Sequence, residues 1–132
     1  MLSNPQEIVN YIIMNHRNQV ARPELFEYLN KVIESGQVIV SYNNNKVNGV
    51  LSYAKISEAD LPFVIQHNDR FQLPENYTSG DIVWIDIVEK DKELTIFSLF
   101  EALMSKEPTI KVFCWLSRRN KVFTTRRRFE HA

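Results

Sequence analysis

The stretch Asp81-Ile82-Val83-Trp84-Ile85-Asp86-Ile87-Val88-Glu89 (residues 81–89) decides the fold class of this 132-residue sequence. Its β-branched and aromatic residues predict a strand. Side chains alternate along a strand, so one face should carry Val83, Ile85 and Ile87, and the other Ile82, Trp84, Asp86 and Val88. Asp86 then stands in an apolar run, where a carboxylate is costly unless a cation or an imidazole pairs with it. The alternative is an edge strand on which Asp86 faces water.

The sequence on both sides of this strand predicts helices and further strands. Apolar residues spaced by three or four behind capping or proline residues predict helices that begin at Pro5, near Pro23, at Ser57 and at Asp91. Strands are expected over 37–42, 47–55, 109–116 and 121–129, the first two forming a hairpin. This order predicts an α+β fold, in which helices pack on the faces of a mostly antiparallel central sheet.

The helix at Pro23 and the helix at Asp91 are each expected to bury one stripe of apolar side chains. For the first, the predicted stripe is Leu25, Phe26, Leu29 and Ile33. For the second, it is Leu94, Phe97, Phe100, Leu103 and Met104. The length, and the lack of a linker or repeat, predict a single domain over residues 1–132.

The composition excludes several kinds of site. Three glycines, at 36, 49 and 80, exclude a glycine-rich phosphate loop. The single Cys114 excludes an intramolecular disulfide and a cysteine-rich zinc site, and it should be a core thiol. No metal site is expected. No apolar run reaches the ~18 residues of a membrane span, and the N-terminal residues lack a secretion signal, so a cytoplasmic location is expected.

The net charge of zero hides an asymmetry along the chain. Residues 1–105 carry 8 basic and 14 acidic side chains, whereas residues 106–132 carry 8 basic and 2 acidic ones. The basic side chains near the C-terminus include Arg118, Arg119, Arg126, Arg127 and Arg128. Three readings are open: a solvated hairpin that balances acidic helices, a docking surface for an acidic protein, and a nucleic-acid-binding surface.

Two short motifs occur in a characteristic order. Asn15-His16-Arg17-Asn18 is followed about sixty residues later by Tyr77-Thr78-Ser79-Gly80-Asp81 and then by Trp84-Ile85-Asp86. This order resembles the toxin-activating lysine acyltransferases, the haemolysin-activating proteins of RTX toxin operons. The resemblance runs from about residue 10 to residue 128. It lapses at 88–93, where a charged stretch replaces the family's apolar loop with Pro and Gly.

The resemblance implies a GNAT-like fold and a protein-lysine fatty-acyltransferase. The acyl group would pass from acyl-acyl-carrier-protein to internal lysines of a protoxin or another protein, without a permanently bound cofactor. The family's essential histidine and aspartate map onto His16 and Asp86. A lysine amine, with a pKa of about 10.4, must lose a proton before it can attack a thioester. His16 would act as the base or as a transient acyl carrier, and Asp86 would orient its ring.

Further residues are expected to bind the donor or the substrate. The central group is Thr78, Ser79, Gly80, Asp81 and Trp84, and the basic group is Arg118, Arg119, Arg126, Arg127 and Arg128. The expected partners are acyl carrier protein and a protein substrate, and family members often form homodimers. Two alternatives remain: a non-catalytic binding module that keeps the acyltransferase fold, and, less favoured, a small nucleic-acid-binding protein that uses the arginine hairpin.

Overall fold

A five-stranded sheet organises the computed structural model of the protein, which describes residues 4–15, 23–67, 71–117 and 121–126. The strands run in the order β1-β2-β3-β4-β5 across the sheet. Their bounds are Val38–Asn43 (β1), Lys46–Ile56 (β2), Ile82–Lys90 (β3), Val112–Leu116 (β4) and Val122–Arg126 (β5). Neighbouring strands are antiparallel except β3 and β4, which are parallel. The predicted α+β class with a mostly antiparallel sheet is therefore confirmed.

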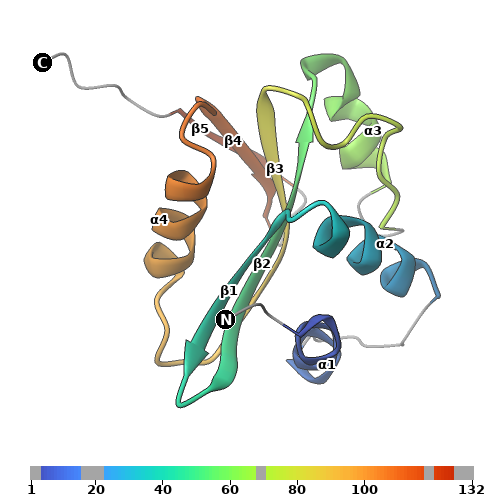
Figure 1. The fold of residues 1–132 in the computed structure, drawn as a ribbon. Helices are drawn as coiled ribbons and strands as arrows, with labels where there is room; N and C mark the ends of the chain where they lie inside the picture. The colour runs from blue at the N-terminus through green and yellow to red at the C-terminus, as the bar shows by residue number, and fades with distance from the viewer. Residues whose placement is uncertain (1–3, 16–22, 68–70, 118–120, 127–132) are drawn as a thin grey trace, which may run out of the picture.

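Helices cover both faces of this sheet (Figure 1). They are α1 (Pro5–Asn15), α2 (Pro23–Glu34), α3 (Leu61–Gln66, after the short 3₁₀ turn η1, Glu58–Asp60) and α4 (Ile96–Lys106). Helix α4 packs on one face, against a cluster that includes Tyr53 and Ile85. Helices α1 and α2 pack on the other face against Val50 and Ile87, and α3 packs there against Trp84 and Cys114. The central strand β3 is thus enclosed between two apolar layers.

Two of the predicted helix starts, at Pro5 and near Pro23, are confirmed by local chemistry, whereas the start at Ser57 gives only the 3₁₀ turn η1 and α3 itself begins at Leu61. Asn4 precedes α1, and its Oδ1 accepts the amide of Gln6 at 2.9 Å. Pro23 opens α2, and Gly36 follows that helix with a φ of 73°, a conformation that glycine adopts without steric cost. Pro62 lies in the first turn of α3, which stays short, as expected.

The predicted start of α4 at Asp91 is wrong. The helix begins at Ile96, because Thr95 is its N-cap and its side chain accepts the amide of Ser98. The Asp91 carboxylate instead accepts the hydroxyl of Tyr11 at 2.8 Å, which ties the connection after β3 to α1. A five-residue segment therefore separates β3 from α4.

Two aromatic residues assigned to buried stripes are exposed. Phe26 is 36% exposed and Phe97 is 73% exposed. The side chains that α2 buries are Leu25, Tyr28, Leu29 and Val32, and those of α4 are Leu99 and Leu103. In each helix the buried residues recur at spacings of three and four, and Phe26 and Phe97 fall outside that seam. Tyr28, which the sequence analysis passed over, lies inside it.

The hairpin and the buried thiol follow the sequence prediction. Strands β1 and β2 are joined through Asn44 and Asn45, whose φ angles of 52° and 64° are left-handed. Asparagine tolerates that conformation better than most residues, which explains the run of three asparagines. Cys114 is 1% exposed and packs beside Trp84, so it is a core thiol.

Candidate active site

Asp86 is an extra residue in the central strand. In the antiparallel pairing of β2 with β3, Tyr53 faces Ile85 and Ser52 faces Ile87, so Asp86 has no Cα partner in the fully described strand β2. This is a β-bulge, which bends a strand and re-aims side chains. Because β3 pairs with both β2 and β4 over Ile82–Ile85, it is not an edge strand, although Asp86 lies beyond the pairing with β4 and keeps partial contact with solvent.

The bulge also changes which side chains share a face. Simple alternation predicted that Ile87 lies with Val83 and Ile85, and that Val88 lies with Trp84. In the structure, Ile87 packs in the cluster of α1 and α2, whereas Val88 packs with Ile85 on the α4 face. The one-residue insertion shifts the pattern by one position beyond Asp86. The predicted face assignment therefore holds up to the bulge and fails after it.

The pairing of the parallel strands β3 and β4 ends just before this bulge. The ladder between β3 and β4 ends at the pair Ile85–Trp115, whereas β3 continues to Lys90 in register with β2. The ring of Trp115 stacks on Phe123 of β5, with centroids 5.9 Å apart. Ligands commonly bind where parallel strands end at their carboxyl ends. Asp86 is the first residue of β3 beyond this ladder.

Burial makes Asp86 an unusual carboxyl group. Loss of contact with water raises the pKa of Asp86 to about 7, and a hydrogen bond with the Tyr28 hydroxyl acts in the opposite direction. A group with a pKa near the ambient pH exists in both protonation states and can exchange a proton. Perturbed carboxyl groups of this kind cluster at functional sites.

Two hydroxyl groups that the sequence analysis missed lie beside the bulge at Asp86. The Tyr28 hydroxyl on α2 lies 2.6 Å from Ser52 Oγ on β2, and both side chains are buried. Ser52 Oγ also accepts the amide of Ile87, at 3.2 Å. A signal was present in the sequence: Ser52 interrupts the apolar run from Val50 to Ala54, and Tyr28 lies three residues after Leu25.

Several predicted site residues lie outside the described residues. These are His16, Arg118, Arg119, Arg127 and Arg128. Helix α1 ends at Asn15, immediately before His16 in sequence, and buries Ile8, Val9 and Ile12 in the cluster that contains Ile87. The described His67 ends α3, with Nδ1 2.9 Å from the carbonyl oxygen of Phe63.

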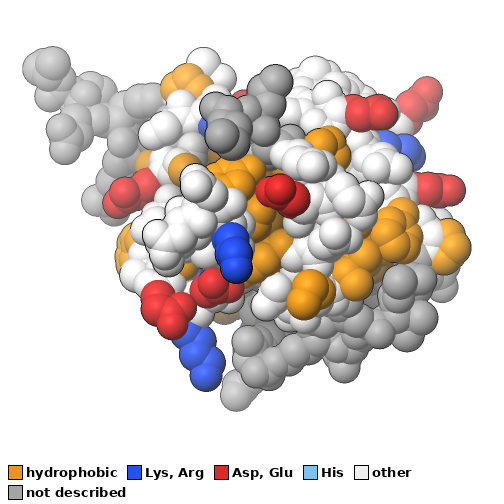
Figure 2. Space-filling model, turned by 60° about the horizontal axis from the view of Figure 1, so that its bottom comes forward, with side chains coloured by type: hydrophobic (Ala, Val, Ile, Leu, Met, Phe, Trp, Pro, Cys, Tyr) orange, Lys and Arg blue, Asp and Glu red, His pale blue; other side chains and the backbone are white. Residues whose placement is uncertain are grey.

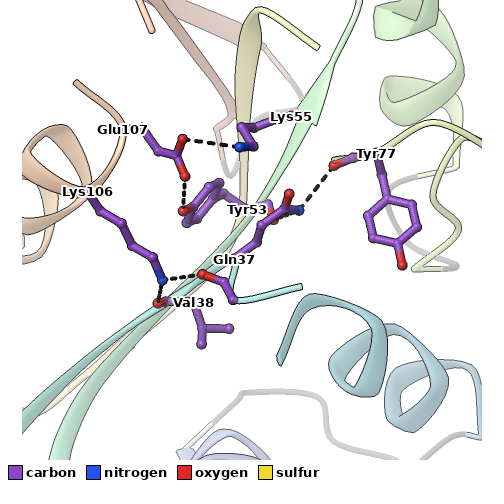
Figure 3. Close-up of polar contacts among 8 residues, drawn as sticks. Gln37, Val38, Tyr53, Lys55, Tyr77, Lys106 and Glu107 are labelled. Atoms are coloured by element: carbon purple, nitrogen blue, oxygen red, sulfur yellow. Dashed lines mark hydrogen bonds and ion pairs between the residues drawn. The ribbon is translucent and has the colours of Figure 1, made fainter. Parts of the chain in front are cut away.

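The motif from Tyr77 to Asp81 serves as a structural connection into β3 (Figure 3). Its backbone runs beside β2: the Lys55 amide donates to the Tyr77 carbonyl at 2.8 Å, and the Gly80 amide donates to the Lys55 carbonyl at 3.1 Å. The buried Gln37 side chain donates to the Tyr77 carbonyl at 3.1 Å. The amide of Gly80 is thus already engaged, which argues against its use in binding the donor or the substrate.

Glycine is required at position 80 by close packing. A Cβ there would lie 2.0 Å from the carbonyl carbon of Ile56. Thr78, Ser79 and Asp81 are exposed. Asp81 lies five positions before Asp86 on the strand, which at ~3.3 Å per residue is about 16 Å. The structure therefore does not bring this motif together with Asp86.

Trp84 and Arg126 are also set apart from Asp86. Trp84 is 1% exposed and packs in the core under α3, so its ring has no surface for a ligand. Arg126 is exposed and faces Val112, whose other neighbour, Ile82, begins β3. Arg126 thus lies at the end of the sheet where β3 begins, four positions before the bulge. It shares that end with the Tyr77–Asp81 motif.

Large apolar side chains remain exposed at several places on the surface. They include Ile96 (54%) and Phe97 (73%) at the start of α4, and Val122 (38%) and Phe123 (48%) on β5. Figure 2 shows apolar side chains reaching the surface on one face, among scattered acidic and basic ones. Within the described ranges, no three His, Cys, Asp or Glu residues come close enough to hold a metal ion. None of the described helices combines the length and apolarity that crossing a membrane requires.

Solved structures identify the fold as GNAT-like. The chain is similar to the GphF GNAT-like decarboxylase in complex with isobutyryl-CoA, with a TM-score of 0.58 and 15% identity over 88% of this chain and 64% of that one. It is also similar to the loading GNATL domain of CurA from Lyngbya majuscula, with a TM-score of 0.52 and 12% identity over 86% and 59%. The chain thus spans less than two thirds of either structure. No protein-family model and no curated protein matches the sequence.

Proposed function

We propose that this protein is an acyltransferase that moves a fatty acyl group from acyl-acyl-carrier-protein to a lysine of a protein substrate such as a protoxin. One observation carries the proposal: the Asp86 carboxyl group, largely withdrawn from water, lies at a bulge where β3 leaves β4, in a GNAT-like fold. The resemblance of the His16 and Asp86 motifs to the toxin-activating lysine acyltransferases supplies the reaction. A solved neighbour on the same fold holds isobutyryl-CoA, an acyl thioester.

The reaction needs a base and a group that steadies it. The lysine amine forms a bond to the acyl carbonyl carbon, the carbon–sulfur bond breaks, and the proton lost by the amine ends on the departing thiol. In the proposal His16 carries that proton, or first accepts the acyl group itself. Asp86 binds the other ring nitrogen and stabilises the imidazolium. The packing of α1 against Ile87, next to Asp86, supports this pairing, since Asn15 at the end of α1 precedes His16.

The donor's pantetheine arm is assigned to the place where β3 and β4 part. There the ladder ends at Ile85–Trp115, and beyond Ile85 no described residue of β4 pairs with β3. The exposed Phe123, stacked on Trp115, offers an aromatic surface for an apolar acyl chain. The basic residues of the C-terminal region would steer the acidic carrier protein by charge complementarity. Of these, the described Lys121 and Arg126 are exposed.

The test is acyl transfer to a candidate protein substrate, followed by mass spectrometry of its lysines. Wild-type protein with acyl-acyl-carrier-protein should add the acyl mass to a lysine, and His16→Ala and Asp86→Asn should abolish this addition while the fold is retained. Asp60→Asn, at the turn before α3, is the matched control. Unchanged acylation by Asp86→Asn would rule out the assigned site.

The non-catalytic binding module is a second candidate, favoured by the charged segment after Asp86. Its Asp91 accepts the hydroxyl of Tyr11, and the Asp91 amide donates to the carbonyl of Asn48 at 2.9 Å, so the segment is anchored to the rest of the fold. Wild-type protein that binds acyl-acyl-carrier-protein in a pull-down but transfers nothing would support this candidate. A third candidate is the small nucleic-acid-binding protein. Salt-sensitive binding of nucleic acid that is lost when Arg126, Arg127 and Arg128 are replaced would support it.

A further inference from the structure

A buried chain of hydrogen bonds leads to Asp86 from the backbone of its own strand. The Ile87 amide donates to Ser52 Oγ at 3.2 Å, and Ser52 Oγ lies 2.6 Å from the Tyr28 hydroxyl. The Tyr28 hydroxyl, placed by this contact, acts in turn on the Asp86 carboxyl group, whose pKa it lowers as a hydrogen-bond donor. Three elements contribute: α2 provides Tyr28, β2 provides Ser52, and the bulged strand β3 provides the rest.

The direction of each hydrogen bond follows from the groups involved. An ionised carboxylate only accepts, so the Tyr28 proton points to Asp86. The remaining contact of Tyr28 is then filled by the Ser52 proton, and the Ser52 oxygen keeps a lone pair for the Ile87 amide. The Ile87 amide, the Ser52 hydroxyl and the Tyr28 hydroxyl thus each have a partner of the right kind. A fully satisfied buried network of this sort holds its members in one arrangement.

The burial of Tyr28 indicates that its hydroxyl group does more than fill space in the core. The side chain is 1% exposed, and a buried hydroxyl is costly unless it is hydrogen-bonded. A phenylalanine would fill the same stripe of α2 without that cost. The ring is also oriented by Phe71, which meets it edge-on at 5.8 Å between centroids.

We infer that Tyr28, supported by Ser52, is a positioning residue for the Asp86 carboxyl group. It holds one carboxylate oxygen toward α2, so that the other oxygen is available to the base of the proposed reaction, His16. The catalytic part of this inference rests on the proposed acyl transfer, whereas the contact itself does not. Within the described residues, burial and Tyr28 are the influences on the Asp86 pKa. The titratable Tyr11 of α1 is bonded to Asp91 instead.

Tyr53 provides a matched control one residue beyond Ser52 on β2. It is also a fully buried tyrosine whose hydroxyl donates to a carboxylate, Glu107, at 2.6 Å (Figure 3). That contact lies on the α4 face of the sheet. The change Tyr53→Phe therefore removes an equivalent hydroxyl without touching the network of Asp86.

The experiment is a titration of the Asp86 carboxyl carbon by ¹³C NMR in wild type, Tyr28→Phe and Tyr53→Phe. Loss of the Tyr28 hydrogen bond should raise the pKa of Asp86 by about one unit, because hydrogen bonds to a charged group favour that form. Tyr53→Phe should leave it in place. In the acyl-transfer assay, Tyr28→Phe should shift the acidic limb of the pH–rate profile upward by the same amount. It should also lower kcat about tenfold, with the donor KM unchanged.

A second variant guards against loss of folding in Tyr28→Phe. Ser52→Ala keeps Tyr28 and removes its support, so it should shift the Asp86 titration in the same direction by less. An Asp86 titration unmoved in both variants overturns the inference, whatever happens to acyl transfer. If Tyr28→Phe moves the titration while Asp86→Asn still transfers acyl groups normally, the proposed function fails at this site. The positioning of Asp86 by Tyr28 then stands.

Discussion

Replacing Asp86 by asparagine is expected to stabilise the protein at alkaline pH. The pKa of Asp86 is about 7 in the folded protein against an ordinary value of 3.8. The folded state therefore binds the proton more tightly than the unfolded state does. Well below the unfolded-state pKa of 3.8, the carboxyl group is neutral in both states and costs nothing. As the pH rises from about 4 to about 7, the unfolded state ionises first and stability is lost.

The size of the effect follows from the shift of about three pKa units. One unit corresponds to ~1.4 kcal/mol, so ionised Asp86 would cost up to about 4 kcal/mol. Asp86 keeps partial contact with solvent, so a discounted range of about 2–4 kcal/mol is appropriate. For a chain of this length, that is an increase in Tm of about 7–14 °C. Asparagine has nearly the same shape, can still accept the Tyr28 proton and does not ionise.

The assay is urea unfolding of wild type and Asp86→Asn at pH 4, 5.5 and 8. The other titrating groups are common to both proteins and cancel in the difference. The gain should be smallest at pH 4, intermediate at pH 5.5 and full at pH 8. Asp60→Asn, at the turn before α3, is the control for the loss of one negative charge. A difference between wild type and Asp86→Asn that stays constant across the three pH values would refute the reasoning.

Three further predictions test the surroundings of this strand. Gly80→Ala should cost at least ~2 kcal/mol in urea unfolding, because the new Cβ would overlap the backbone of Ile56; an unchanged midpoint would contradict the packing. Thr95→Ala should cost about 1 kcal/mol in the same assay, since it removes the cap of α4. Cys114 should resist a thiol reagent until the protein is unfolded, because it is 1% exposed; rapid labelling of the native protein would argue against a buried thiol.

The fold class could be predicted because local and long-range signals agree along most of the chain. The strand at 82–90, the asparagine turn and the proline-led helices α1 and α2 were all visible as patterns of residue type. The start of α4 was missed because an acidic residue after a strand looks like a cap. Here that residue bonds Tyr11, which is 80 positions away in sequence. A contact between residues so far apart in the sequence cannot be recognised from the residues around Asp91.

The candidate site was only partly predictable, for a related reason. Asp86 stood out because a carboxylate in an apolar run has a known cost. Tyr28 and Ser52 did not stand out, because each is an ordinary residue in its own element. Their role follows from the tertiary contact between α2 and β2, which brings the two hydroxyl groups within hydrogen-bond distance. The Tyr77–Asp81 motif shows the converse case, since a recognisable pattern there holds a strand connection in place.

The failure of alternation at Asp86 is itself an argument for function. An inserted residue in a central strand disrupts the ladder, and a buried ionisable group costs stability at neutral pH. Both costs fall on one residue here, and the parallel pairing with β4 ends at the position just before it. A strand selected for stability alone would carry a valine in register at this point. Departures from local rules that are supported by a dedicated hydrogen-bond network are expected where a protein acts on a ligand. For Asp86→Asn we predict higher stability together with loss of acyl transfer. This combination would show that Asp86 lowers stability in exchange for activity.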